Sequence, residues 1–89
     1  MAYTVSLSEK ALRDLDSLDV SPRKRIFKFL DERLSRLDNP RSIGAALQGS
    51  KLKNHWKYRV GDYRIIARIE DSFLVIGIIR IGHRREVYR

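Results

Sequence analysis

Basic side chains and one tyrosine in the C-terminal half of the sequence have the chemistry needed to cleave RNA. They are Lys57, Arg59, Arg64, Arg84 and Tyr88. Cleavage by the ribose itself requires removal of the 2′-hydroxyl proton, stabilisation of charge on the phosphate and a proton for the leaving 5′-oxygen. A lysine becomes a base where neighbouring cations favour its neutral form, an arginine fork suits a phosphate, and a tyrosine can stack on a base. Spacing alone makes this chemistry possible and does not establish it.

The distribution of charge predicts a polyanionic partner. The chain has 89 residues, with 19 Lys and Arg against 11 Asp and Glu, a formal net charge of +8 and a pI near 10.3. Residues 51–89 hold ten basic and four acidic side chains, whereas residues 1–50 hold nine basic and seven acidic ones. Basic charge concentrated in one half is typical of proteins that bind nucleic acid. A protein that is basic only for solubility remains the alternative.

Other kinds of site are poorly supported by the composition. The sequence has no cysteine, which excludes disulfides, thiolate zinc sites and cysteine catalysis. It has no glycine-rich phosphate loop and no serine elbow. His55 and His83 remain an alternative acid–base pair. The two histidines and the scattered carboxylates lack the spacing of metal ligands, so we expect neither a metal nor a cofactor. The longest apolar run, residues 73–79, is too short to span a bilayer, and residues 1–4 do not resemble a secretory signal. We therefore expect a soluble cytoplasmic protein.

Hydrophobic periodicity predicts the elements that position these side chains within one domain of residues 1–89. Alternation with a period of two predicts a strand over residues 3–7. Ser8 is expected to cap a first helix. A second helix is expected to begin with Ser21 as its cap and Pro22 as its first residue, and to end at residues 39–40. Residues 45–47 are expected to form a short helical turn.

The period of two returns in the second half of the chain. Strands are expected over residues 56–60, 63–70 and 73–81, joined by tight turns and followed by a polar tail from Gly82. These strands predict a three-stranded antiparallel meander whose last strand is buried on both faces. The whole order predicts an α+β fold in which a hairpin of two helices packs on one face of the sheet.

Alternation along two of these strands predicts a cationic face. Trp56, Tyr58 and Val60 share one side of their strand and are expected to face the helices. The opposite side of the two strands then carries Lys57, Arg59, Arg64 and Arg68. Four neighbouring cations repel one another unless an anion binds among them. We therefore favour an anion site over the alternative of an ordinary solvated face.

Three segments of the sequence resemble the RelE branch of the RelE/ParE toxin superfamily. They are residues 1–12, residues 56–66 (WKYRVGDYRII) and residues 81–88 (IGHRREVY). The resemblance covers essentially the whole chain and implies a microbial-ribonuclease-like fold. It also implies a bacterial or archaeal toxin of a type II toxin–antitoxin system that enters the ribosomal A site. There such a toxin cuts the mRNA codon without metal, through attack of the 2′-hydroxyl.

The same resemblance implies partners and an alternative activity. The expected partners are the ribosome with its mRNA and an acidic, RelB-like antitoxin, with operator DNA bound only through the toxin–antitoxin complex. No membrane partner is expected. The alternative is a ParE-like toxin, which has the same fold and inhibits DNA gyrase without cutting RNA.

Matching the family motifs position by position implies site residues. The expected catalytic residues are Lys57, Arg59, Arg64, Arg84 and Tyr88, and the expected RNA- and ribosome-binding residues are Lys51, Lys53, Arg68, His83 and Arg85. Lys57 or Tyr88 is expected to remove the proton from the 2′-hydroxyl, and Arg59 is expected to bind the phosphate.

The remaining roles concern the transition state and the leaving group. Arg64 is expected to stabilise the transition state. Arg84 is expected to protonate the leaving oxygen, with His83 as the alternative acid. Tyr88 is also expected to stack on a substrate base.

Overall fold

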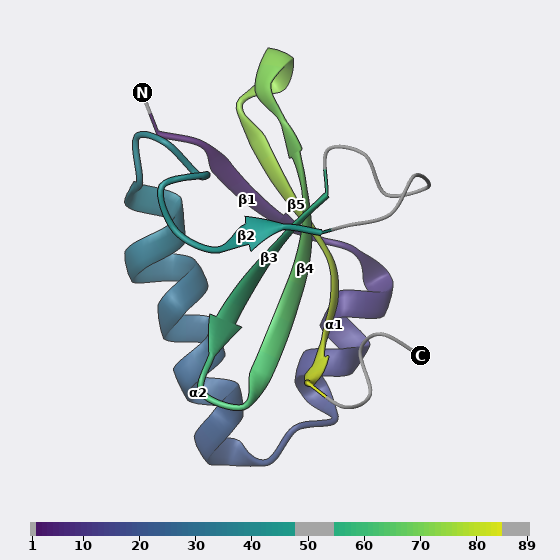
Figure 1. Cartoon of the computed structure of the whole chain (residues 1–89). Coiled ribbons are helices and arrows are strands. Elements are labelled where there is room, and N and C mark those ends of the chain that lie inside the picture. Colours follow the sequence, from purple (N-terminus) through teal and green to yellow (C-terminus); the bar gives the residue numbers. More distant parts are fainter. Residues whose placement is uncertain (1, 48–54, 85–89) are drawn as a thin grey trace.

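The computed structural model describes residues 2–47 and 55–84 and has the predicted α+β architecture (Figure 1). Its elements are β1 (Thr4–Leu7), α1 (Glu9–Asp16), α2 (Val20–Lys28), the π-helical turn η1 (Phe29–Arg33), the 3₁₀ turn η2 (Leu34–Arg36), β2 (Ala45–Ala46), β3 (His55–Val60), β4 (Tyr63–Glu70), the 3₁₀ turn η4 (Asp71–Phe73) and β5 (Val75–His83). Four predicted site residues lie outside the described residues: Lys51, Lys53, Arg85 and Tyr88.

The first helix begins as predicted. Ser8 has an extended backbone, and its hydroxyl oxygen accepts a hydrogen bond from the amide of Ala11 at 3.0 Å, which satisfies a donor at the start of α1. The same residue contacts the sheet, because its amide donates to the carbonyl of Ile78 and its hydroxyl to that of Ile79. The Ser8 cap therefore fixes the direction of α1 relative to β5.

The second helix differs from the prediction at both ends. It begins at Val20 with Asp19 as the N-cap, so Pro22 is the third helical residue instead of the first. Proline is tolerated there because amides in the first turn have no partner within the helix. The helical segment widens to a π-helical turn in η1, tightens to a 3₁₀ turn in η2 and ends at Arg36, before the expected residues 39–40. Figure 1 shows α1 and α2 as a hairpin joined by a short loop.

The strands form one sheet in the order β1-β5-β4-β3-β2. The predicted antiparallel meander of β3, β4 and β5 is confirmed. Strand β1 joins it in parallel beside β5, with Thr4 opposite Val75, so β5 lies inside the sheet. The expected helical turn at residues 45–47 is wrong, because Ala45 and Ala46 form β2 and pair with β3.

The last strand also differs from the prediction. Phe73 belongs to η4, and β5 runs from Val75 to His83, so Gly82 lies within the strand. Strand β5 begins later than expected because the turn before it is wider. The amide of Leu74 donates to the carbonyl of Asp71, and Leu74 adopts a φ of 53°.

The core lies between the helices and one face of the sheet, as predicted. The helices contribute Ala11, Leu15, Ile26, Leu30 and Leu34, and the sheet contributes Tyr58, Val60, Ile65, Ala67, Ile76, Ile78 and Ile81. The expectation that β5 is buried on both faces is wrong, because Val75, Gly77 and Ile79 on its other face are only half-buried. Leu12 remains 48% exposed, although it belongs to the leucine pattern of its helix.

Candidate active site

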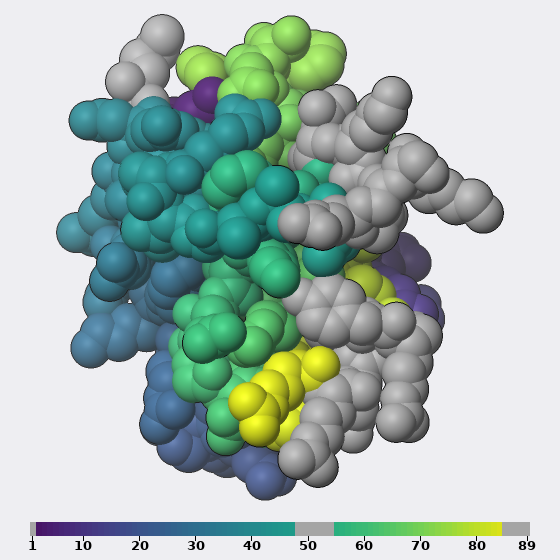
Figure 2. All heavy atoms as spheres, in the orientation of Figure 1, coloured from purple at the N-terminus to yellow at the C-terminus, as the bar shows by residue number. Residues whose placement is uncertain are grey.

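The pairing of β3 with β4 brings basic side chains together on the face of the sheet that lies away from the helices. Arg59 is directly opposite Arg64, and Lys57 is opposite Ile66. Residues directly opposite one another in an antiparallel pair project to the same face. The predicted sharing of one face is therefore confirmed, and it includes Arg68, which is opposite His55. In Figure 2, β3 and β4 (green) and the end of β5 (yellow) are exposed on the side that faces the viewer.

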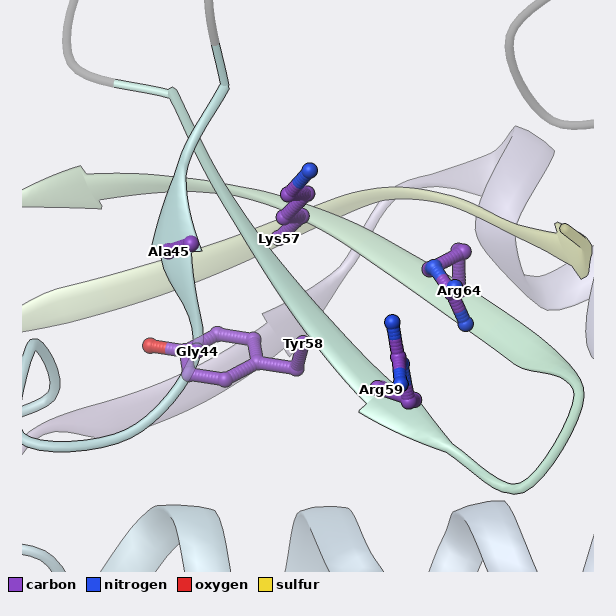
Figure 3. Close-up of a pocket in the computed structure, with 6 residues that line it drawn as sticks. All are labelled: Gly44, Ala45, Lys57, Tyr58, Arg59 and Arg64. Carbon is purple, nitrogen blue, oxygen red and sulfur yellow. The ribbon is translucent and has the colours of Figure 1, made fainter.

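Three of these cations line one open cavity of about 240 Å³, which we call the cationic cavity. Its lining residues are Gly44, Ala45, Lys57, Tyr58, Arg59 and Arg64. Figure 3 shows Lys57, Arg59 and Arg64 pointing to the same side of the strands, whereas the ring of Tyr58 points away from them. No lining residue is acidic, and no ion pair to these three cations is found in the described part of the chain. Mutual repulsion makes the cavity a favourable place for an anion.

Arg68 lies beyond the cationic cavity and has a different environment. Its Nε is 3.6 Å from Oε1 of Glu70 on the same strand, and both side chains are largely exposed. An exposed pair of this kind contributes little to stability but reduces the local positive charge. Of the four cations on this face, Arg68 is therefore the one least suited to hold a phosphate.

One wall of the cationic cavity is a segment that the sequence pattern did not identify. Gly44 has a φ of 80°, and a Cβ at this position would overlap the carbonyl oxygen of Lys57 and lie 2.7 Å from Nε1 of Trp56. Only glycine allows so close an approach to β3. The sequence shows a glycine just before two alanines. The need for glycine there arises from contacts with residues of β3, which follow it by more than ten positions.

Hydrogen bonds from the helix-facing side of β3 hold the same segment. The indole nitrogen of Trp56 donates to the carbonyl of Ile43 at 2.7 Å, and the hydroxyl of Tyr58 donates to the carbonyl of Pro40 at 2.6 Å. Burial raises the pKa of Tyr58 to about 12, so its phenol keeps the donated proton. Strand β3 therefore presents two of the cations on one side and anchors the cavity wall from the other.

Arg84 is placed near the cationic cavity by its backbone. Its amide donates to the carbonyl of Asp62 at 2.9 Å, next to the turn between β3 and β4. Arg59 and Arg64 flank this turn, so the three arginines lie at the same end of the sheet.

The two histidines are not brought together. His83 is opposite Tyr63, with ring centroids 5.8 Å apart in an edge-on contact, and lines a separate cavity with Asp14 and Leu18 on the helix side. His55 is opposite Arg68 at the other end of β3, on the cationic face. An acid–base pair of His55 and His83 is therefore incompatible with the fold.

The described residues form neither a cluster of metal ligands nor a membrane-spanning helix. Among residues 2–47 and 55–84, no three His, Asp or Glu side chains lie close enough together to hold a metal ion. Within the same residues, none of the helices has the length and apolar character needed to cross a membrane.

Several known toxins are similar to this chain over nearly its whole length. Residues 5–88 match the family described as ParE toxin of type II toxin-antitoxin system, parDE. The chain is 34% identical to Toxin RelG of Mycobacterium tuberculosis over 89 residues, covering 100% of this chain and 99% of the relative. It is 31% identical to mRNA interferase toxin RelE of Escherichia coli K12 over 90 residues, covering 99% and 92%.

Solved structures agree with these sequence matches. The toxin–antitoxin complex RelBE2 of Mycobacterium tuberculosis contains a chain that superposes with a TM-score of 0.84 at 31% identity, covering 97% of this chain and 95% of that one. A chain of the intact Escherichia coli RelBE complex superposes with a TM-score of 0.71 at 25% identity, covering 92% and 96%. With its five-stranded sheet and paired helices, the chain thus belongs to the ParE toxin family of type II toxin–antitoxin systems and is a RelE-type toxin.

Proposed function

We propose that this toxin is an endoribonuclease that cuts mRNA in the ribosomal A site through attack of the ribose 2′-hydroxyl. The observation that carries the proposal is the cationic cavity, in which Arg59 and Arg64 are directly opposed and Lys57 adjoins them without a lining carboxylate. The relative named mRNA interferase toxin RelE supports the same activity.

The arrangement suits the charge that develops during cleavage. A phosphodiester gains negative charge as the 2′-oxygen attacks. Two neighbouring guanidinium groups that line a cavity therefore stabilise the transition state more than the ground state. Arg59 and Arg64 are the groups for this task. Lys57 is the candidate base in the described part of the chain, and Arg84 is the candidate donor to the leaving oxygen.

Dependence on the ribosome follows from how open the cavity is. The cavity provides charge but few surfaces that would hold a flexible strand for in-line attack. A ribosome that fixes the codon would supply this orientation, which accounts for a large part of many rate enhancements. The free toxin is therefore expected to be a very poor nuclease. Equal rates of cleavage for naked and ribosome-bound mRNA would contradict the proposal.

The decisive experiment compares two arginine variants on programmed ribosomes. Arg64→Ala is expected to lower the single-turnover cleavage rate by about 10²-fold with little change in ribosome affinity, because a transition-state contact is lost. Arg68→Ala is the matched control, since Arg68 lies on the same face outside the cavity and is paired with Glu70. Primer extension would map the cuts. Equal effects of both substitutions on binding alone would indicate a simple RNA-binding surface.

Two further basic residues are proposed to act in binding. Lys51→Ala and Lys53→Ala are expected to weaken ribosome binding in a manner that depends on salt concentration, because they would remove contacts with phosphates. A loss of cleavage rate at saturating ribosome concentration would assign them to catalysis instead.

We also propose that an acidic, RelB-like antitoxin inhibits the toxin and links it to operator DNA. An apolar groove of about 350 Å³ lies between β1 and the two helices. Its rim includes Leu12 and Phe27, which are 48% and 60% exposed. Apolar anchors in this groove, combined with attraction to a chain of charge +8, fit a flexible acidic partner. The RelB-bound structures of similar toxins support this assignment.

The alternative activity is inhibition of DNA gyrase, and it is favoured by the ParE description of the matching family. A supercoiling assay with purified gyrase separates the two activities. Inhibition of gyrase together with intact mRNA on programmed ribosomes would replace the ribonuclease proposal.

A further inference from the structure

A cluster of three side chains joins distant segments at one end of the sheet. Oδ1 of Asp71 accepts hydrogen bonds from the Tyr3 hydroxyl at 2.7 Å and from Nη1 of Arg41 at 2.9 Å, and Oδ2 accepts from Nη2 of Arg41 at 3.0 Å. Asp71 belongs to the turn between β4 and β5, Tyr3 precedes β1, and Arg41 precedes β2. Figure 1 shows these segments together at the end of the sheet opposite the β3–β4 turn.

The segment that carries Arg41 forms the wall of the cationic cavity. Gly44 and Ala45 line the cavity, and the segment bonds to β3 through the backbone at β2 and at the amide of Leu47, which donates to the carbonyl of His55. The residues before Gly44 are held to the sheet by side-chain hydrogen bonds instead. Those from Trp56 and Tyr58 reach these residues from β3. The two that Arg41 donates to Asp71 fix the segment to the far end of the sheet.

The geometry and exposure of the Arg41–Asp71 pair indicate that it positions the segment carrying Arg41 more than it stabilises the fold. The side chains are 35% and 55% exposed, so the pair contributes only modestly to global stability. Its two parallel hydrogen bonds, however, restrict the direction as well as the distance of the guanidinium. The carboxyl of Asp71 has a pKa lowered to about 2, mainly by its hydrogen bond with Arg41, so the pair stays ionised at neutral pH.

We infer that Arg41 and Asp71 are positioning residues for the proposed RNA cleavage, because their paired hydrogen bonds hold the segment that forms one wall of the cationic cavity. Neither residue lines the cavity. The inference rests on the proposed function for its effect on cleavage, but its structural part can be measured without any nuclease activity.

The structural part is tested with the single tryptophan as a reporter. The indole N–H of Trp56 donates to Ile43 in the same wall, so its hydrogen exchange reports how firmly the wall is held. In Arg41→Ala and Asp71→Ala, exchange of this proton, followed by NMR, is expected to be about five-fold faster, the range for loss of a partly exposed ion pair. Tyr3→Phe is the matched control, because it removes a hydrogen bond to Asp71 without releasing Arg41. Unchanged exchange in Arg41→Ala would overturn the inference, as would equal acceleration in Tyr3→Phe.

The catalytic part is tested with the same variants on programmed ribosomes. The single-turnover rate is expected to fall about five-fold in Arg41→Ala and in Asp71→Ala, with the half-saturating ribosome concentration unchanged and with no further loss in the double variant. Faster indole exchange with full cleavage, or additive losses in the double variant, would overturn the role in cleavage. If the wild-type toxin itself does not cut mRNA, the proposed function fails and the role in cleavage fails with it. Indole exchange would still decide whether the pair holds the wall.

Discussion

Replacing Gly44 with alanine measures how strictly the cavity wall depends on a close backbone approach. At a φ of 80° an L-residue is strained by about 1 kcal/mol. The added methyl group would also overlap the carbonyl of Lys57 and lie 2.7 Å from Nε1 of Trp56 and 2.9 Å from Cδ1 of Tyr58. Overpacking of this kind costs about 2 kcal/mol where backbone has to move. Gly44→Ala is therefore expected to lower the free energy of unfolding by about 3 kcal/mol.

The assay is equilibrium unfolding in urea, and the control is a second glycine of the sheet. For a chain of this size the expected loss lowers the midpoint by about 2–3 M. A Cβ at Gly77 would lie 3.7 Å from the carbonyl oxygen of Arg68, an ordinary contact at an ordinary φ. Gly77→Ala is therefore expected to change the free energy of unfolding by less than about 1 kcal/mol. A Gly44→Ala protein as stable as the Gly77→Ala protein would refute the argument from close approach.

Three further predictions concern hydrogen bonds and the apolar groove. The pKa of Asp71 is lowered from 3.8 to about 2, so the contribution of its ionised carboxylate to stability is complete above pH 4 and lost as the pH falls towards 2. Asp71→Asn should therefore reduce the pH dependence of thermal unfolding in that interval. Tyr58→Phe leaves the carbonyl of Pro40 without its 2.6 Å donor and should cost about 1–3 kcal/mol in urea unfolding, and a smaller loss would show that water replaces the hydroxyl. Phe27→Glu should weaken antitoxin binding at least about ten-fold in calorimetry and leave mRNA cleavage unchanged, because Phe27 lines the groove and not the cationic cavity. Unchanged affinity would show that the antitoxin binds elsewhere.

Features that depend on near neighbours in the chain could be predicted from the sequence. The Ser8 cap needs only the amide of Ala11 three residues later. The opposition of Arg59 and Arg64 follows from alternation on two strands joined by a tight turn, because the turn length determines which residues face each other. The cationic face was therefore predictable, although its role in catalysis stays a prediction.

Features that depend on distant contacts could not be predicted. Ala45 and Ala46 favour helix locally but form a strand, because Gly44 fits against β3 and two aromatic side chains hold the preceding residues. The hydrogen bonds from Arg41 to Asp71 link positions 30 residues apart and leave no periodic signal. The wall of the cationic cavity was missed for this reason, since its position is determined entirely by the tertiary fold.

The parallel pairing of β1 with β5 has a consequence for synthesis of the chain. Strand β1 is made first, but within residues 2–47 and 55–84 the strand that pairs with it is β5, with Thr4 opposite Val75. Helix α1 also packs mainly against β5, and Ser8 and Asp14 both bond to the backbone of that strand. A nascent chain therefore cannot complete its sheet until β5 has left the ribosome, and such late, long-range closure slows folding. Translation that stops before β5 would release a fragment without a folded core, so incomplete copies of the toxin should be inactive and readily degraded.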